Sequence, residues 1–118
     1  MALYTFKPVV LSALNKAVKS LENAKSNMDV NLARVEGIKA QPSKIFYACR
    51  GFDIIAEVEL NGKRFNCTQT YELNEGSDIA LERTGVSFQD ERGDWETEYT
   101  DSGTIVEMLK VLRKLAGV

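Results

Sequence analysis

A chain of 118 residues, with 44% hydrophobic and 27% charged residues, has room for one domain with a single core and lies outside the disordered and low-complexity classes. The chain has no histidine, so a Ser-His-Asp triad, a Cys-His pair or a histidine-ligated zinc site cannot be built from this chain alone. The formal net charge of −2 and the pI of about 5.2 argue against nucleic-acid binding, for which a domain pI above roughly 9 is typical.

The first residues show no basic cluster followed by an apolar run, and no stretch approaches the length that spans a bilayer. We therefore expect a cytoplasmic protein without membrane contact. The two cysteines, Cys49 and Cys67, are too far apart for a CxxC motif, and we expect free, buried thiols.

Hydrophobic residues at alternating steps of three and four predict a long N-terminal helix over residues 8–36. Pro8 suits its first turn, and Gly37 followed by Pro42 suits its end. The mean step of 3.5 residues is typical of a helix that faces one partner along its whole length. This candidate self-association seam consists of Leu11, Leu14, Val18, Leu21, Lys25, Met28, Leu32 and Val35.

A straight helix of this length would measure about 42 Å, which exceeds the diameter of a compact domain of this size. Either a second copy of the chain buries the excess, or the polar stretch 23–31 bends the helix; we favour the continuous helix. Lys25, the one charged seam residue, either limits register and partner number or marks the turn where the helix leaves the core. We therefore predict a homo-oligomer, with a dimer as the first expectation.

From Lys44 the hydrophobic pattern changes to period two, which predicts an antiparallel meander of about five strands over residues 44–100. Asn61-Gly62 is typical of a two-residue hairpin turn of type I′. The cross-strand pairs are then Leu60 with Lys63, Glu59 with Arg64, Val58 with Phe65, Glu57 with Asn66, and Ala56 with Cys67. The predicted inward face holds Ile54, Ala56, Val58, Leu60, Phe65, Cys67 and Tyr71.

Residues 79–83 are predicted as a short strand, and residues 86–91 and 95–100 as a second hairpin about Arg92-Gly93. The inward side chains of this hairpin are expected to be Val86, Phe88, Trp95, Thr97 and Tyr99. Residues 103–116 are predicted as a C-terminal helix, because Thr104 and Glu107 have capping-box spacing and Gly117 follows. The predicted fold class is α+β, one domain over residues 1–118, with both helices packed on one face of the sheet.

Six carboxylates within twelve residues form the densest charge in the chain. Five of them make a candidate acidic patch for a protein partner: Asp90, Glu91, Asp94, Glu96 and Glu98. Glu96 and Glu98 also fit a plain solvated strand face, since they alternate with less polar residues. The spacing is not that of a calcium-binding EF-hand loop, and we predict no metal site.

A candidate small-ligand pocket between subunits is suggested by side chains able to stack on or clamp a ligand: Arg50, Tyr71, Arg83, Trp95 and Tyr99. No glycine-rich phosphate loop is present, because the glycines stand singly. Residues 1–67 hold ten Lys or Arg against six Asp or Glu, whereas residues 68–118 hold five against eleven. These opposite charges either pair two copies or pair a basic helix with an acidic sheet inside one monomer.

These patterns favour a non-catalytic binding protein, without cofactor, that self-associates and acts by occupying a partner protein, as an adaptor, inhibitor or small chaperone does. One alternative is a protein that binds or sequesters a small ligand such as a nucleotide in an intersubunit pocket. A third is a metal-dependent enzyme that uses the acidic cluster.

Overall fold

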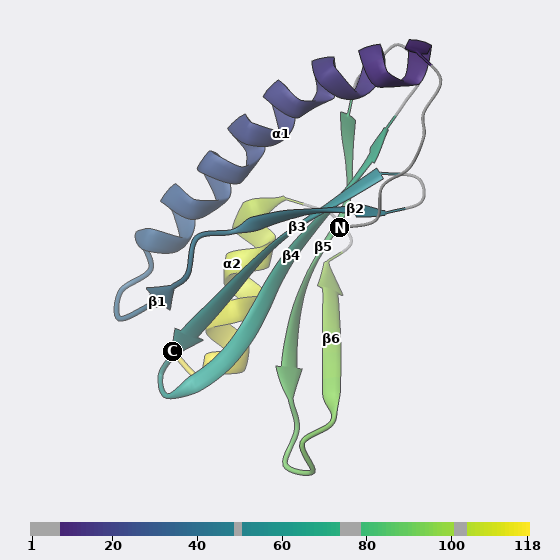
Figure 1. Cartoon of the computed structure of the whole chain (residues 1–118). Coiled ribbons are helices and arrows are strands. Elements are labelled where there is room, and N and C mark those ends of the chain that lie inside the picture. Colours follow the sequence, from purple (N-terminus) through teal and green to yellow (C-terminus); the bar gives the residue numbers. More distant parts are fainter. Residues whose placement is uncertain (1–7, 49–50, 74–78, 101–103) are drawn as a thin grey trace.

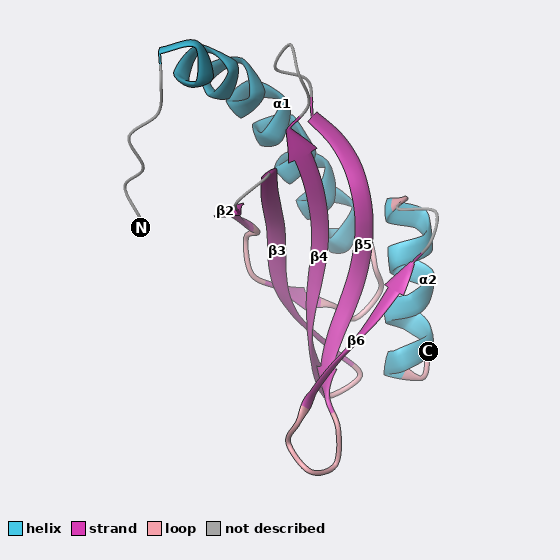
Figure 2. Ribbon diagram, turned by 90° about the vertical axis from the view of Figure 1, so that its right-hand side faces the viewer, coloured by secondary structure: helices cyan, strands magenta, loops and turns pink. Residues whose placement is uncertain are grey.

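The computed structural model describes residues 8–48, 51–73, 79–100 and 104–118 (Figure 1). Its elements are α1 (Pro8–Ala33), β1 (Lys39–Ala40), β2 (Lys44–Ala48), β3 (Gly51–Leu60), β4 (Lys63–Leu73), β5 (Ile79–Gln89), β6 (Trp95–Thr100) and α2 (Ile105–Ala116). The six strands form one antiparallel sheet, and Figure 2 shows α1 passing behind β3, β4 and β5, with β6 beside α2. The predicted α+β fold is confirmed, with six strands where about five were predicted.

Helix α1 is continuous over 26 residues, as predicted, and ends at Ala33, three residues before the expected end. The chain leaves the helix through Gly37, whose φ of +80° favours glycine. From the middle of the helix onward, four seam residues are buried against the sheet of the same chain: Leu21, Met28, Leu32 and Val35. Val18 is 39% exposed, and the side chains of Leu11 and Leu14 lie outside the described part of the chain.

The hairpin between β3 and β4 has the predicted register, from Leu60 opposite Lys63 to Ala56 opposite Cys67. Asn61 and Gly62 adopt φ angles of +54° and +75°, which the type I′ turn requires. The predicted inward residues of β3 and β4 are buried, except that Tyr71 is half-buried.

Two expectations for the second hairpin are wrong. Residues 79–89 form one strand, and the register of β5 against β4 shifts between Thr70 and Tyr71, which leaves Glu82 without a partner. The inward face of β6 is also the opposite of the predicted one. Gln89 and Trp95 form the pair next to the turn, which consists of the five residues 90–94. Since a strand alternates its faces, Glu96, Glu98 and Thr100 share the face of Val86, and the predicted inward residues Trp95, Thr97 and Tyr99 lie on the other side.

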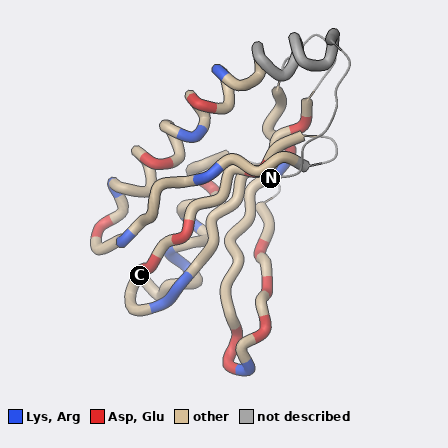
Figure 3. Tube along the Cα trace, in the orientation of Figure 1, with Lys and Arg blue, Asp and Glu red and all other residues tan. Residues whose placement is uncertain are grey.

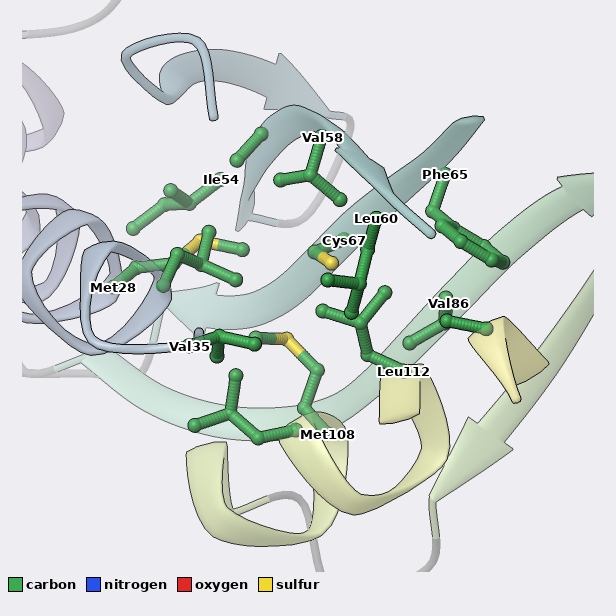
Figure 4. Close-up of a cluster of buried hydrophobic side chains, with 14 of the residues drawn as sticks. Met28, Val35, Ile54, Val58, Leu60, Phe65, Cys67, Val86, Met108 and Leu112 are labelled. Carbon is green, nitrogen blue, oxygen red and sulfur yellow. The ribbon is translucent and has the colours of Figure 1, made fainter. Parts of the chain in front are cut away.

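Both helices pack their apolar stripes against the same face of the sheet and form one core (Figure 4). In α2, Thr104 accepts a hydrogen bond from the backbone N–H of Glu107, and Gly117 ends the helix with a φ of +77°, as the sequence predicts. The rival caps Asp101 and Ser102 lie outside the described residues. With this face covered, the opposite face of the sheet is left for other contacts.

Candidate functional site

One face of the sheet is covered by neither described helix, and we call it the outer face. It is formed by the residues that alternate with the core positions of each strand. Register places the following residues on it: Asp53, Ile55, Glu57, Glu59, Arg64, Asn66, Thr68, Thr70, Arg83, Gly85, Ser87, Trp95, Thr97 and Tyr99. Its centre is small and polar, while exposed aromatic side chains stand toward its margins.

Two adjoining hollows of about 410 and 570 Å³ form a continuous groove on this face, which we call the outer-face groove. Gln41, Glu57 and Asn66 line both hollows. The first hollow also has Lys39, Val58, Glu59, Arg64, Phe65 and Trp95 in its wall, and the second has Pro42, Ser43, Lys44, Phe46 and Ile55. These volumes lie in the range of small-ligand and peptide-anchor sites.

The rim of the groove is formed where the chain leaves the sheet between β1 and β2. Both short strands pair with β3, but residues 41–43 between them do not continue the ladder. Pro42 has no backbone N–H to donate, which suits this interruption. The N–H of Gln41 still donates to the carbonyl of Glu57 at 2.9 Å, so the rim begins at a fixed point on β3.

Charged side chains of both signs line the groove. Glu59 lies opposite Arg64 as predicted, yet its ion pair is with Lys39 of β1, at 3.7 Å. The Lys39 side chain is 82% exposed, so this pair stabilises the fold little. Glu57 is exposed and stands in the floor shared by both hollows.

Exposed aromatic rings flank the groove. Trp95 is 54% exposed and Phe46 is 48% exposed, although both have large apolar surfaces. Farther along β6, the Tyr99 ring lies next to Gly85 of β5, and the guanidinium carbon of Arg83 is 4.4 Å from the ring centroid. This cation–π contact joins β5 to β6 on the outer face.

The predicted ligand pocket is only partly assembled in one chain. Arg83, Trp95 and Tyr99 share the outer face, and Arg83 contacts Tyr99. Tyr71 lies on the helix-covered face, where burial raises its pKa. Arg50 lies outside the described residues.

The predicted acidic patch follows β6 and its turn, drawn in red in Figure 3. Asp90 closes the turn, because its carboxylate accepts hydrogen bonds from the backbone N–H groups of Arg92 and Asp94, each at 2.9 Å. Glu98 pairs with Lys114 of α2 at 3.3 Å. Glu91, Asp94 and Glu96 are exposed, and within the described ranges none of these three forms an ion pair.

The seam residue Lys25 pairs with Asp29 at 3.2 Å on the same helix. The other carboxylate oxygen of Asp29 accepts a 2.9 Å hydrogen bond from the backbone N–H of Ser43 at the groove rim. Burial raises the pKa of Asp29, but the bonds from Ser43 and Lys25 outweigh it and hold the pKa below its ordinary value. Asp29 is therefore charged at neutral pH.

The described part of the interior contains polar groups and the free thiol of Cys67, while Cys49 lies outside the described residues. The hydroxyls of Thr84 and Thr100 hydrogen-bond each other, and the side-chain oxygen of neighbouring Gln69 is buried without a hydrogen-bond partner among the described residues. Burial raises the pKa of the Cys67 thiol to about 12. Across the described ranges, no three His, Cys, Asp or Glu side chains lie close enough together to hold a metal ion.

The groove does not follow from the sequence pattern. Glu57, Asn66 and Arg64 are predicted as cross-strand partners, whereas Gln41 and Ser43 have no predicted role. The available signal was the break that Pro42 makes between two extended segments, each of which begins with a lysine, Lys39 and Lys44.

Comparison of the chain with protein-family models, with curated proteins and with solved structures finds no match. Among the described residues, no helix is both long enough and apolar enough to cross a membrane.

Proposed function

We propose that this chain is a non-catalytic binding protein that occupies a partner protein through the outer-face groove. The observation that supports this function is the groove on an uncovered sheet face, in which one hollow has exposed Trp95 with charged Lys39 and Arg64 and the other has exposed Phe46. Tryptophan, phenylalanine and arginine are enriched where proteins bind one another, and a central aromatic residue often supplies much of the binding energy.

The residues at the margins of the sheet favour a partner that binds on the face of the sheet over a partner that adds a strand at its edge. Edge strands in natural proteins are commonly protected by lysine, proline or inward-pointing charges. Lys39, Pro42 and Lys44 stand along the β1–β2 margin, and Glu96 and Glu98 point toward the helix-covered side of β6. Two copies of β6 paired antiparallel would bring these carboxylates together, which is unfavourable.

Self-association through α1 is also part of this proposal, in a narrower form than the sequence suggested. The apolar seam residues from Leu21 onward are buried inside the monomer, so a partner helix that packs along the seam would contact apolar seam residues only before Leu21. Val18, 39% exposed, belongs to that part. We expect a dimer and a cytoplasmic location on the sequence arguments alone.

The test is affinity capture from a cell lysate with the wild-type chain, Trp95→Ala and Val106→Ala, quantified by mass spectrometry. Val106 is a matched control because it is 58% exposed but lies on α2, away from the groove. The proposal expects at least one protein to be retained by the wild type and Val106→Ala and reduced about tenfold by Trp95→Ala, as for a central aromatic anchor. Equal retention by all three proteins would refute binding through the groove.

A second candidate is a small-ligand protein, favoured by the volumes of about 410 and 570 Å³ and by the polar floor of Glu57 and Asn66. Native mass spectrometry of freshly purified protein, followed by the denatured sample, tests it together with the subunit number. Extra mass that is lost on denaturation, and that is absent from Trp95→Ala, supports the ligand. The bare chain mass in both samples, with no thermal shift in a nucleotide and metabolite screen, counts against it.

A further inference from the structure

Helix α1 and the outer-face groove lie on opposite faces of the sheet, yet one contact joins them around the sheet margin. Asp29 of α1 accepts a 2.9 Å hydrogen bond from the backbone N–H of Ser43, and Ser43 lines the groove. The second oxygen of the same carboxylate is 3.2 Å from the ammonium nitrogen of Lys25, one helical turn earlier. Lys25, the charged residue that interrupts the hydrophobic seam, therefore takes part in this contact through its pair with Asp29.

The contact holds one end of the groove rim. The other end is held by the Gln41 N–H, which donates to the Glu57 carbonyl at 2.9 Å. Only Pro42 stands between these two anchored residues, and Ser43 is 2% exposed. The rim, residues 41–43, is held to β3 at one end and to α1 at the other. Because it is so short, it has little freedom to move by itself, and its position depends on both elements.

The chemistry of the contact makes it stronger than an ordinary surface bond. Hydrogen bonds to an ionised carboxylate are roughly twice as strong as those between neutral groups. The Asp29 side chain is 30% exposed and that of Lys25 is 28% exposed, so water screens the pair less than it screens the other ion pairs of the described residues.

We propose that Asp29 is a positioning residue that couples α1 to the outer-face groove, so that the placement of α1 sets the position of the rim. This inference rests on the proposed function, because it assigns a control element to the same groove. Coupling of this kind is reciprocal: a partner that displaces the rim also acts on α1, and an event on α1 changes affinity in the groove.

The test compares the wild type with Asp29→Ala, Asp29→Asn and, as a matched control, Glu22→Ala, an exposed carboxylate on α1. Two local readouts are used: amide hydrogen exchange of Ser43, and acrylamide quenching of Trp95, the one tryptophan of the chain, which shares a hollow with Gln41. Asp29→Ala is expected to raise Ser43 exchange roughly tenfold and to change Trp95 quenching.

Asp29→Asn keeps an oxygen acceptor but loses the charge, so Ser43 exchange should fall between that of the wild type and that of Asp29→Ala. Far-UV circular dichroism with urea shows whether a variant has lost its whole fold, in which case Asp29→Asn supplies the comparison. Wild-type exchange at Ser43 and wild-type quenching of Trp95 in a folded Asp29→Ala variant would overturn the coupling. An equal change in Glu22→Ala would also overturn it.

These readouts require no partner, so the two proposals fail in different ways. If Ser43 and Trp95 respond to Asp29→Ala but no captured protein depends on Trp95, the coupling stands and the partner-binding function is refuted. If a captured protein depends on Trp95 but neither local readout responds, the function stands and the coupling is refuted.

Discussion

The side-chain amide of Asn61 donates a 2.7 Å hydrogen bond to the backbone carbonyl of Ala116, which joins the β3–β4 turn to the last turn of α2. The Lys63 ammonium lies 3.5 Å from the Leu115 carbonyl beside it. The last carbonyls of a helix have no partner within the helix, and side-chain donors stabilise them. Asn61 thus forms the hairpin turn and also caps a helix that lies 55 residues later in the chain.

Two variants distinguish the role of Asn61 in the turn from its role in capping α2. Asn61→Gly keeps the positive φ of the turn and loses only the bond to Ala116, so we expect a loss of about 1 kcal/mol in the free energy of unfolding. Asn61→Ala loses the bond and also strains the turn, which adds about 1 kcal/mol. Urea unfolding followed by circular dichroism measures both; equal stability of the two variants would contradict the double role.

Gly51→Ala should destabilise the fold for a purely steric reason. A Cβ atom at this position would overlap the backbone carbonyl of Tyr71 on the neighbouring strand. We expect a loss of about 2 to 3 kcal/mol in urea unfolding. Gly85→Ala is the control: its Cβ would meet the half-exposed Tyr99 ring at 3.0 Å, which can move, so a loss as large as that of Gly51→Ala would contradict this reason.

Cys67 should resist alkylation in the folded protein. Its thiol is fully buried and its pKa is raised to about 12, so almost no thiolate is present at pH 8. Iodoacetamide treatment followed by peptide mass spectrometry should leave the Cys67 peptide unmodified in buffer and modify it in urea. Rapid modification in buffer, with the circular dichroism of the folded protein retained, would show that the site is open.

Val18→Asp and Leu21→Asp should have different consequences. Leu21 is 1% exposed in the core, so an aspartate there should unfold the monomer. Val18 is 39% exposed, so its aspartate variant should stay folded and lose the dimer if α1 associates as proposed. Native mass spectrometry and circular dichroism together decide this; a folded Val18→Asp variant with the mass of the wild-type oligomer would contradict association at this position.

The contribution of Asp29 to stability should depend on pH. Its pKa in the folded protein is below the ordinary value of 3.8, so the unfolded chain binds the proton more tightly and the charged form stabilises the fold. This stabilisation is complete above the unfolded pKa and is lost as pH falls through the folded pKa. The difference in unfolding free energy between wild type and Asp29→Asn should therefore be constant at neutral pH and should decrease at a lower pH, below the unfolded value of 3.8. A difference that persists at the lower pH would contradict a charge effect.

Local signals in the sequence were sufficient for both helices and for the first hairpin, but they did not predict β1 or the single strand over residues 79–89. Asn61-Gly62 fixed the turn and hence every pair from Leu60 to Ala56, because a two-residue loop permits one register. The register of the second hairpin could not be predicted in this way, since a loop of five residues permits more than one register. A shift of one residue in the register exchanges the two faces of the strand, so it decides whether Trp95 or Glu96 points inward. The alternation of aromatic with acidic residues favoured Trp95 inward, which is wrong, because the pairing with β5 places Glu96, Glu98 and Thr100 on the inner face.

The α+β order, the inward face of β3 and β4, and the caps of α2 can be predicted from the amino-acid sequence, since each depends on residues near one another in the chain. That the apolar seam from Leu21 packs on the sheet of the same chain is known only from the folded molecule, because an apolar helix stripe has the same pattern whether a sheet or a second helix covers it. The contact of Asp29 with Ser43 and the groove are likewise products of the fold. Those contacts join segments whose separation along the chain carries no periodic signal.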